Sequence, residues 1–171
     1  SELHPALLEL STNFEYNDAV GTHNFIRTEQ IHNNILKVSS DLKDTMICIN
    51  SRHRMLAIYL KYFQTRNKKY AQDADKLIQD PYFTEAAKTQ TYRGKLKMYE
   101  TYMLYWNVKG RLDLASHYAK KALEHHFTHP AQLKKNQMQC VSMLNNFFTM
   151  NMERKRYDLA NIALQKFREV S

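Results

Sequence analysis

A short sequence that recurs at a fixed spacing constrains the fold of this chain more than any other feature. Arg-Leu-Asp-Leu-Ala at residues 111–115 returns as Arg-Tyr-Asp-Leu-Ala at residues 156–160, an offset of 45 residues. A weaker copy at residues 69–74 precedes the first by 42 residues. Each copy opens a helical pattern that follows a long, aromatic-rich one. Repeats of this size predict a stack of helix pairs, in which each unit buries its faces against its neighbours.

The rest of the sequence also favours helices. Apolar residues recur at spacings of three and four, and no Asn-Gly or Asp-Gly turn separates alternating apolar runs. The 171 residues include only 3 glycines and 3 prolines, too few for the many turns of a β-sandwich or barrel. We therefore predict an all-α fold, a right-handed superhelix of stacked antiparallel helix pairs, as a single domain over residues 1–171.

Six helices are expected, and breakers mark several of their ends. Pro81 ends the second, Gly110 stops the third, and Pro130 suits the first turn of the fifth. Residues 1–40 are expected to form a helical segment or a partial repeat, within a larger protein that supplies further units. The expected helices are residues 41–67, 68–80, 84–109, 111–127, 130–152 and 155–170, paired into units at about 41–80, 84–127 and 130–170.

The second unit resembles a tetratricopeptide repeat. Tyr99 and Trp106 match the large aromatic positions of the first helix in that family, and Gly110 matches the turn. Ala115 and Ala122 match the two small positions of the second helix, which let the paired helices approach closely. The resemblance implies an α-solenoid that binds a protein or peptide and has no catalytic activity or cofactor of its own.

The repeats also depart from the family pattern. A tetratricopeptide unit has about 34 residues, whereas these copies lie 45 and 42 residues apart. In the third unit Lys155 stands at the turn and Phe167 at a small position, and in the first unit Asp73 stands at a small position. The longer unit is similar to variant arrays of bacterial regulators, where such repeats form a sensor or docking domain. HEAT-type repeats have a similar length but lack the pattern of one glycine and two alanines.

The resemblance places the partner-binding surface on the first helix of each unit. Asn145 is notable there, because a side-chain amide can both donate to and accept from a peptide backbone. Simple exposure and turn capping are the alternative interpretations of this residue. The amphipathic last helix could equally cover a further repeat or a second copy in a homodimer. The candidate partner-binding residues are Lys97, Glu100, Leu104, Asn107, Ser142, Asn145 and Thr149.

Charge supports a second hypothesis. The chain carries a net charge of +8, and residues 1–50 are acidic, whereas the remainder is strongly basic. Residues 51–69 interleave basic and aromatic side chains without an acidic one, a pattern that suits single-stranded nucleic acid. A solvated face is the alternative, since no helix-turn-helix spacing, zinc finger or RNP motif accompanies it. The candidate basic patch is Arg52, Arg54, Lys61, Arg66, Lys68 and Lys69.

Residues that could carry chemistry have structural alternatives. His125 and His129 would share a face of a continuous helix and could hold a metal ion, but Pro130 favours an end of the helix before His129. Cys48 and Cys140 lie among apolar residues and are interpreted as small buried side chains. No phosphate-binding loop or nucleophile motif is present, so we expect neither an enzyme, a metal site nor a cofactor, with a motif-free helical enzyme as a third hypothesis.

No apolar run approaches the length that a membrane span requires, and no signal peptide is visible. A location in the cytoplasm is therefore favoured, without membrane insertion of this segment.

Overall fold

The computed structural model describes residues 45–63, 68–85 and 91–170, together with the helical residues 30, 33, 34 and 37. The predicted N-terminal segment of residues 1–40 otherwise lies outside the described residues. Every secondary structure element in the described ranges is an α-helix, which confirms the all-α prediction. The helices are α3 (Thr45–Phe63), α4 (Lys68–Leu77), α5 (Pro81–Thr84), α6 (Tyr92–Val108), α7 (Leu112–Phe127), α8 (Pro130–Lys135), α9 (Gln137–Glu153) and α10 (Tyr157–Val170).

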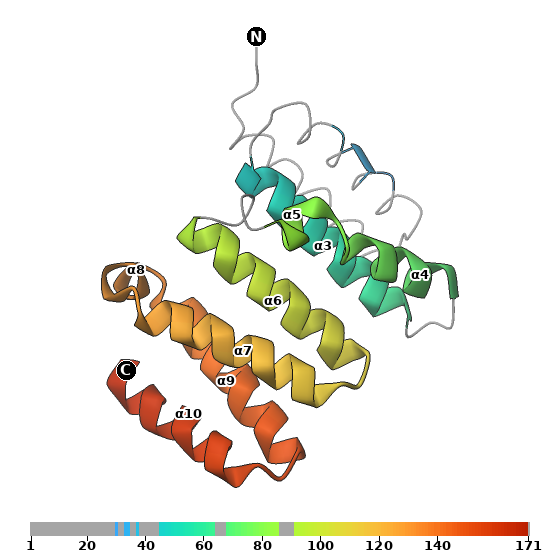
Figure 1. Cartoon of the computed structure of the whole chain (residues 1–171). Coiled ribbons are helices and arrows are strands. Elements are labelled where there is room, and N and C mark those ends of the chain that lie inside the picture. Colours follow the sequence, from blue (N-terminus) through green and yellow to red (C-terminus); the bar gives the residue numbers. More distant parts are fainter. Residues whose placement is uncertain are drawn as a thin grey trace.

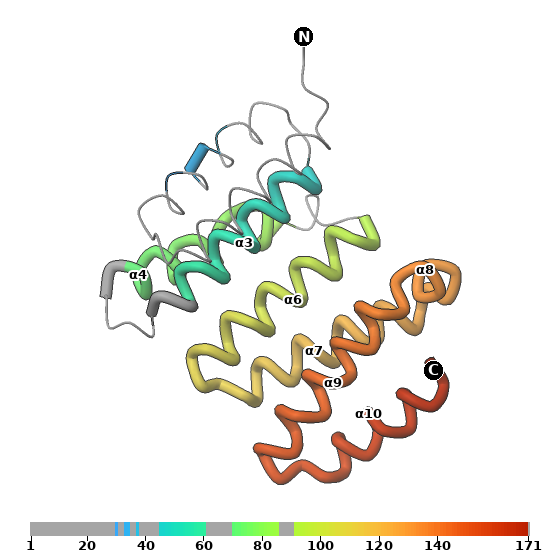
Figure 2. Tube along the Cα trace, turned by 180° about the vertical axis from the view of Figure 1, so that it is seen from behind, coloured from blue at the N-terminus to red at the C-terminus, as the bar shows by residue number. Residues whose placement is uncertain are grey.

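The six longer helices follow one another through the molecule as a series of neighbours. α4 packs on α3, α3 on α6, α6 on α7, α7 on α9 and α9 on α10. Figure 1 shows this series from α3 down to α10, with α7 and α10 in front of α9, and Figure 2 shows it from behind. Within the series, α3 and α4, α6 and α7, and α9 and α10 form three helix pairs at the positions of the three expected units.

The predicted helix of residues 84–109 starts later than expected. Its helical part, α6, begins at Tyr92, and the short helix α5 stands before it. The preceding helix, α4, ends at Leu77, earlier than the predicted end at residue 80, and Pro81 opens α5 as its first residue. The Asp80 carboxylate caps this helix by accepting a hydrogen bond from the Tyr82 amide at 2.9 Å.

The predicted helix of residues 130–152 is divided into α8 and α9. Asn136 separates them, because its backbone leaves the helical region at φ −124° and ψ 32°. Pro130 occupies the first turn of α8, as its fixed φ predicts. The break at Asn136 has no glycine or proline signal in the sequence.

Two turns of the structure are the same, and they are separated by the 45-residue offset of the repeat. Gly110 and Lys155 both have a positive φ, at 74° and 57°. After them, the Arg111 amide donates to the Trp106 carbonyl at 2.9 Å, and the Arg156 amide donates to the Asn151 carbonyl at 2.8 Å. Each of the two helices is therefore followed by a residue in the left-handed region, and the next amide hydrogen-bonds back into the last helical turn.

The residues after each turn repeat as well. Arg111 donates from Nε and Nη2 to the two carboxylate oxygens of Asp113, and Arg156 bonds Asp158 in the same way. Ala115 and Ala160, which follow in the repeated sequence, are both buried at the helix contact. The repeated pentapeptide thus specifies a turn, an arginine–carboxylate clamp and a close helix contact at each copy.

This duplicated turn gives a paired prediction. Lys155→Gly should raise the free energy of unfolding by about 0.5–1 kcal/mol, because a side chain at positive φ is strained and glycine is not. Gly110→Ala should lower the free energy of unfolding by about 1 kcal/mol. The loss should come from backbone strain alone, because no heavy atom lies within 4 Å of the added Cβ. Urea denaturation measures both effects, and a loss of stability in Lys155→Gly would contradict the argument.

Two apolar clusters hold the series together. The larger one joins α6, α7, α9 and α10 and includes a row of small residues on α7. The smaller one joins α3, α4 and α6 and buries Ala74, the neighbour of Asp73. Phe167 is partly buried and packs against the larger cluster.

Candidate partner-binding surface

A polar bridge joins α6 to α9 at the position of two predicted binding residues. Lys97 Nζ lies 2.5 Å from one carboxylate oxygen of Glu100. The other carboxylate oxygen of Glu100 accepts a hydrogen bond from the side-chain amide of Gln139, at the start of α9. Lys97 and Glu100 are therefore engaged with each other and with α9, and they are not two free contacts for a partner.

A histidine on α3 lies beside this bridge. His53 Nδ1 lies 2.7 Å from the Thr101 hydroxyl, which itself donates to the Lys97 carbonyl at 2.6 Å. Because that hydroxyl proton is already used, Nδ1 of the neutral ring is the donor to Thr101. Burial, and then the charge of Lys97, lowers the pKa of His53 from 6.5 to about 4. The ring is thus neutral at physiological pH, with Nδ1 fixed by Thr101.

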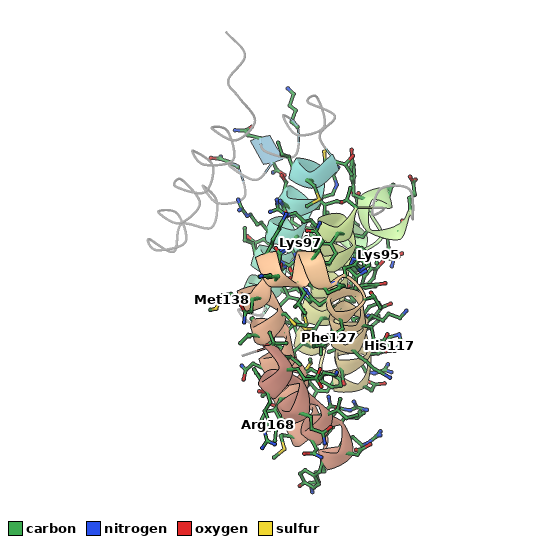
Figure 3. The ribbon with its side chains drawn as sticks, turned by 90° about the vertical axis from the view of Figure 1, so that its left-hand side faces the viewer. Lys95, Lys97, His117, Phe127, Met138 and Arg168 are labelled. Atoms are coloured by element: carbon green, nitrogen blue, oxygen red, sulfur yellow. The ribbon has the colours of Figure 1, made fainter. Side chains whose placement is uncertain are left out.

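An exposed polar stripe runs along α9. Ser142, Asn145 and Thr149 are all exposed, and in the described part of the chain none of their side chains is hydrogen-bonded to another residue. Met138, one turn earlier on the helix, is 81% exposed. Figure 3 shows Met138 projecting from the α9 side, opposite to His117 of α7. We define the α9 face as these four residues: Met138, Ser142, Asn145 and Thr149.

The other two predicted contacts on α6 differ from each other. Asn107 is exposed, as predicted. Leu104 is half-buried and packs against the cluster of α3, α4 and α6. Its apolar side chain therefore contributes to this cluster, and its role as a binding residue stays a prediction.

Arg52, the first residue of the predicted basic patch, makes contacts within the chain. Its side chain is only 12% exposed, lies 4.2 Å above the Tyr82 ring and is 2.9 Å from the Asp80 carboxylate. Arg52 therefore fastens the segment of residues 80–84 to α3 and offers no free charge. Arg54 is half-buried. The side chains of Lys61, Lys68 and Lys69, and the whole of Arg66, lie outside the described residues.

The histidines near residue 126 pack around Tyr92. α7 ends at Phe127, so His129 lies outside the helix, as Pro130 predicts. His125 Nε2 donates to the Tyr92 carbonyl at 3.2 Å, and the rings of His125 and His129 lie 4.5 Å apart. Among the described residues, no group of three or more metal-ligating side chains is assembled.

His126 is the buried member of this group. Its Nδ1 lies 2.7 Å from the Tyr92 hydroxyl, and its Nε2 is buried without a hydrogen-bond partner. A proton added at Nε2 would have no acceptor, and burial lowers the pKa of His126 from 6.5 to about 4.

Cys48 and Cys140 are both free and fully buried, in agreement with their interpretation as small apolar side chains. Burial raises the pKa of Cys140 to about 11, which keeps it a thiol.

Gln139 of the polar bridge, and Thr101 and His53 beside it, were absent from the predicted site. Thr101 and Gln139 carried no signal, because a mid-helix threonine and glutamine are unremarkable in one sequence. His53 and Thr101 are 48 residues apart in the sequence and meet only because α3 packs on α6. The sequence alone does not show which helices pack together, so it could not place these two residues side by side.

Comparison of the chain with protein-family models, curated proteins and solved structures found no match. In the described part of the chain, no helix has both the length and the apolar character that a membrane span requires.

Proposed function

We propose that this chain is a tetratricopeptide-like helical repeat module that binds a peptide segment of a partner protein on its α9 face. The observation that carries the proposal is the row of unpaired polar side chains on α9. Ser142, Asn145 and Thr149 keep donors and acceptors in solvent at i, i+3 and i+7, so they lie along one side of the helix. An extended peptide has backbone groups to match such a row.

The polar bridge supports this proposal by fixing the surface. Gln139 of α9 is tied to Glu100 of α6, so the end of α9 is held in place before a partner arrives. A surface that is already ordered loses less conformational entropy on binding. The duplicated turn supports the repeat assignment, because it places the same structure 45 residues apart in two helix pairs.

Selection from a random peptide library, with the whole chain as bait, tests the proposal. Selected peptides should bind the unchanged chain and lose about tenfold in affinity on Asn145→Ala, since one or two hydrogen bonds are removed. Gln165→Ala is the matched control, an exposed amide on α10. Fluorescence anisotropy with a labelled peptide measures the Kd, and the melting temperature of both variants should remain unchanged.

Two results would contradict the proposal. The first is a library that yields no peptide above background. The second is a set of peptides whose affinity survives Asn145→Ala and Thr149→Ala but falls with the control on α10. Loss of binding together with a lower melting temperature would report unfolding, so the affinity is compared only between variants of equal stability.

A further inference from the structure

Three exposed cations gather at one end of the α9 face. Lys134 and Lys135 are the last two residues of α8, directly before α9. Arg168 is near the end of α10, and Gln137, the first residue of α9, donates a hydrogen bond to the last backbone carbonyl of α10, so these two helix ends lie side by side. Figure 3 shows Arg168 on the same side of the molecule as Met138. We define the basic end as Lys134, Lys135 and Arg168.

The positive charge of the basic end is not neutralised by the chain itself. In the described part of the chain, none of its three cations is in an ion pair or a hydrogen bond through its side chain. The carboxylates close to them are already occupied, because Glu169 is paired with Lys166, and Glu100, which holds the start of α9, is paired with Lys97. The basic end therefore presents a charge of +3 to a partner.

The opposite end of the α9 face is much less positive. The turn after α9 contains three cations and two carboxylates, and their charges sum to +1. One of these carboxylates, Asp158, binds Arg156. Between the two ends, the α9 face is uncharged. The positive charge is thus concentrated at the start of α9, and it attracts a partner that is negative at one end only.

The other side of α9 has no such excess of charge. A groove with a volume of about 320 Å³ lies there between α7 and α10, and it is lined mostly by apolar side chains. In Figure 1, α7 and α10 are in front of α9 along this groove. Its two lysines, Lys120 and Lys166, are paired with Glu124 and Glu169. An anionic partner is therefore attracted to the basic end and not to the groove.

The distribution of charge favours a peptide over a nucleic acid. A nucleic acid strand has a phosphate at every nucleotide, and proteins follow such a strand with a continuous basic track and aromatic side chains on which the bases stack. None of the exposed residues of α9 is aromatic, and between its first and last turns none is charged. A peptide can carry acidic side chains at one end and present neutral backbone groups to the polar row.

The length of the α9 face sets the size of the peptide. From Met138 to Thr149 the helix rises about 16 Å, at about 1.5 Å per residue. An extended peptide covers this distance with about five residues, since it spans about 3.3 Å per residue. About three more residues reach the basic end. Met138, which is 81% exposed, stands between the two parts, so an apolar peptide residue fits directly after the acidic ones.

We propose that the partner of the α9 face is an acidic peptide segment of about eight residues. Two or three aspartate or glutamate residues at one of its ends lie over the basic end, and the uncharged remainder runs along the α9 face. This inference rests on the proposed function, because it names the chemistry of the peptide that the α9 face binds.

Selection from a random octapeptide library, with the whole chain as bait and about 50 mM NaCl in the buffer, tests the inference. The selected peptides should carry two or three acidic residues at one end, followed by an apolar residue. Fluorescence anisotropy with one labelled peptide of this set measures its Kd. The Kd should rise at least about threefold when NaCl is raised to about 300 mM, because salt screens exposed charge pairs.

Two double variants make the test specific. Lys134→Gln/Lys135→Gln should weaken the labelled peptide about threefold to tenfold at low salt and reduce the effect of added salt, since two exposed ion pairs are lost. Lys95→Gln/Lys121→Gln is the matched control, because it removes the same charge from exposed positions on α6 and α7. Figure 3 shows Lys95 on the side away from Met138. The control should bind the peptide as the unchanged chain does.

The outcomes separate this inference from the proposed function. Selected peptides that lose affinity on Asn145→Ala but have no acidic end, or that bind Lys134→Gln/Lys135→Gln unchanged, would overturn the inference and leave the proposed function standing. A library without any binding peptide would overturn both. Equal weakening by the control pair would assign the effect to the net charge of the chain and overturn the inference.

A nucleic acid is tested in the same assay. A random single strand of about 20 nucleotides should bind more weakly than the selected peptide, because most of the α9 face offers its phosphates no cation. Tighter binding of this strand, lost in Lys134→Gln/Lys135→Gln and kept in Asn145→Ala, would assign the basic end to a nucleic acid and overturn the inference.

Discussion

Leu96→Ala is expected to lower the free energy of unfolding by about 3 kcal/mol. Leu96 is 1% exposed and belongs to the cluster that joins α6, α7, α9 and α10. Truncation removes buried methyl groups and leaves a cavity between helices whose ends are fixed by turns and clamps, so the surrounding residues can collapse only in part. Urea denaturation followed by far-UV circular dichroism measures the loss.

Leu164→Ala is the matched control for this prediction. It makes the same chemical change on α10, where the side chain is 46% exposed. Its cost should stay below about 0.5 kcal/mol, as for most surface substitutions. Equal losses for the two variants would mean that the burial of Leu96 does not describe the folded protein in solution.

Stability should fall steeply as the pH drops from about 6.5 to about 4. His53 and His126 both have a pKa of about 4 in the folded protein, whereas an unfolded histidine titrates near 6.5. Between these values the unfolded chain binds more protons than the folded one, so acid favours unfolding. The stabilisation that comes from keeping the two histidines neutral is complete above pH 6.5, the unfolded pKa. It is lost as the pH falls from 6.5 to about 4. We expect a loss of about 1–2 kcal/mol per histidine between pH 7 and pH 5.

Asparagine variants test the assignment of this loss. Asparagine can replace the Nδ1 hydrogen bonds that His53 makes with Thr101 and that His126 makes with Tyr92, but it does not titrate. His53→Asn and His126→Asn should each flatten the pH dependence of stability. His117→Asn, on the exposed side of α7, should leave it as steep as before. If a variant that carries both His53→Asn and His126→Asn kept the full pH dependence of stability, groups other than these two histidines would be responsible for it.

Sequence reasoning was most accurate where local chemistry decides the structure. Gly110 and Pro130 ended and began helices at the expected residues, because their backbone preferences act without help from the rest of the fold. Lys155 illustrates the limit of such rules. It was a departure from the expected glycine, yet it adopts the same positive φ, since the packing of α9 on α10 imposes the turn. The break at Asn136 had no local signal at all.

The candidate site was less predictable, because its properties depend on contacts between distant helices. Helical spacing was enough to find the exposed side of α9, but it could not show that Lys97 and Glu100 bind each other. It also could not show that Arg52 turns onto Tyr82, because the position of α5 against α3 is not encoded in either segment. The groove between α7 and α10 is lined by side chains of three helices, so no single segment of the sequence indicates it.

The serial packing of the helices has a consequence for how the chain gains and loses its structure. Each of the longer helices packs mainly on one or two others that are close to it in sequence, so the loops to be closed during folding are short. A low contact order of this kind favours rapid folding, with each hairpin able to nucleate by itself. α10 packs mainly on α9 alone, so local opening should begin there, and its amide protons should exchange with solvent before those of α7.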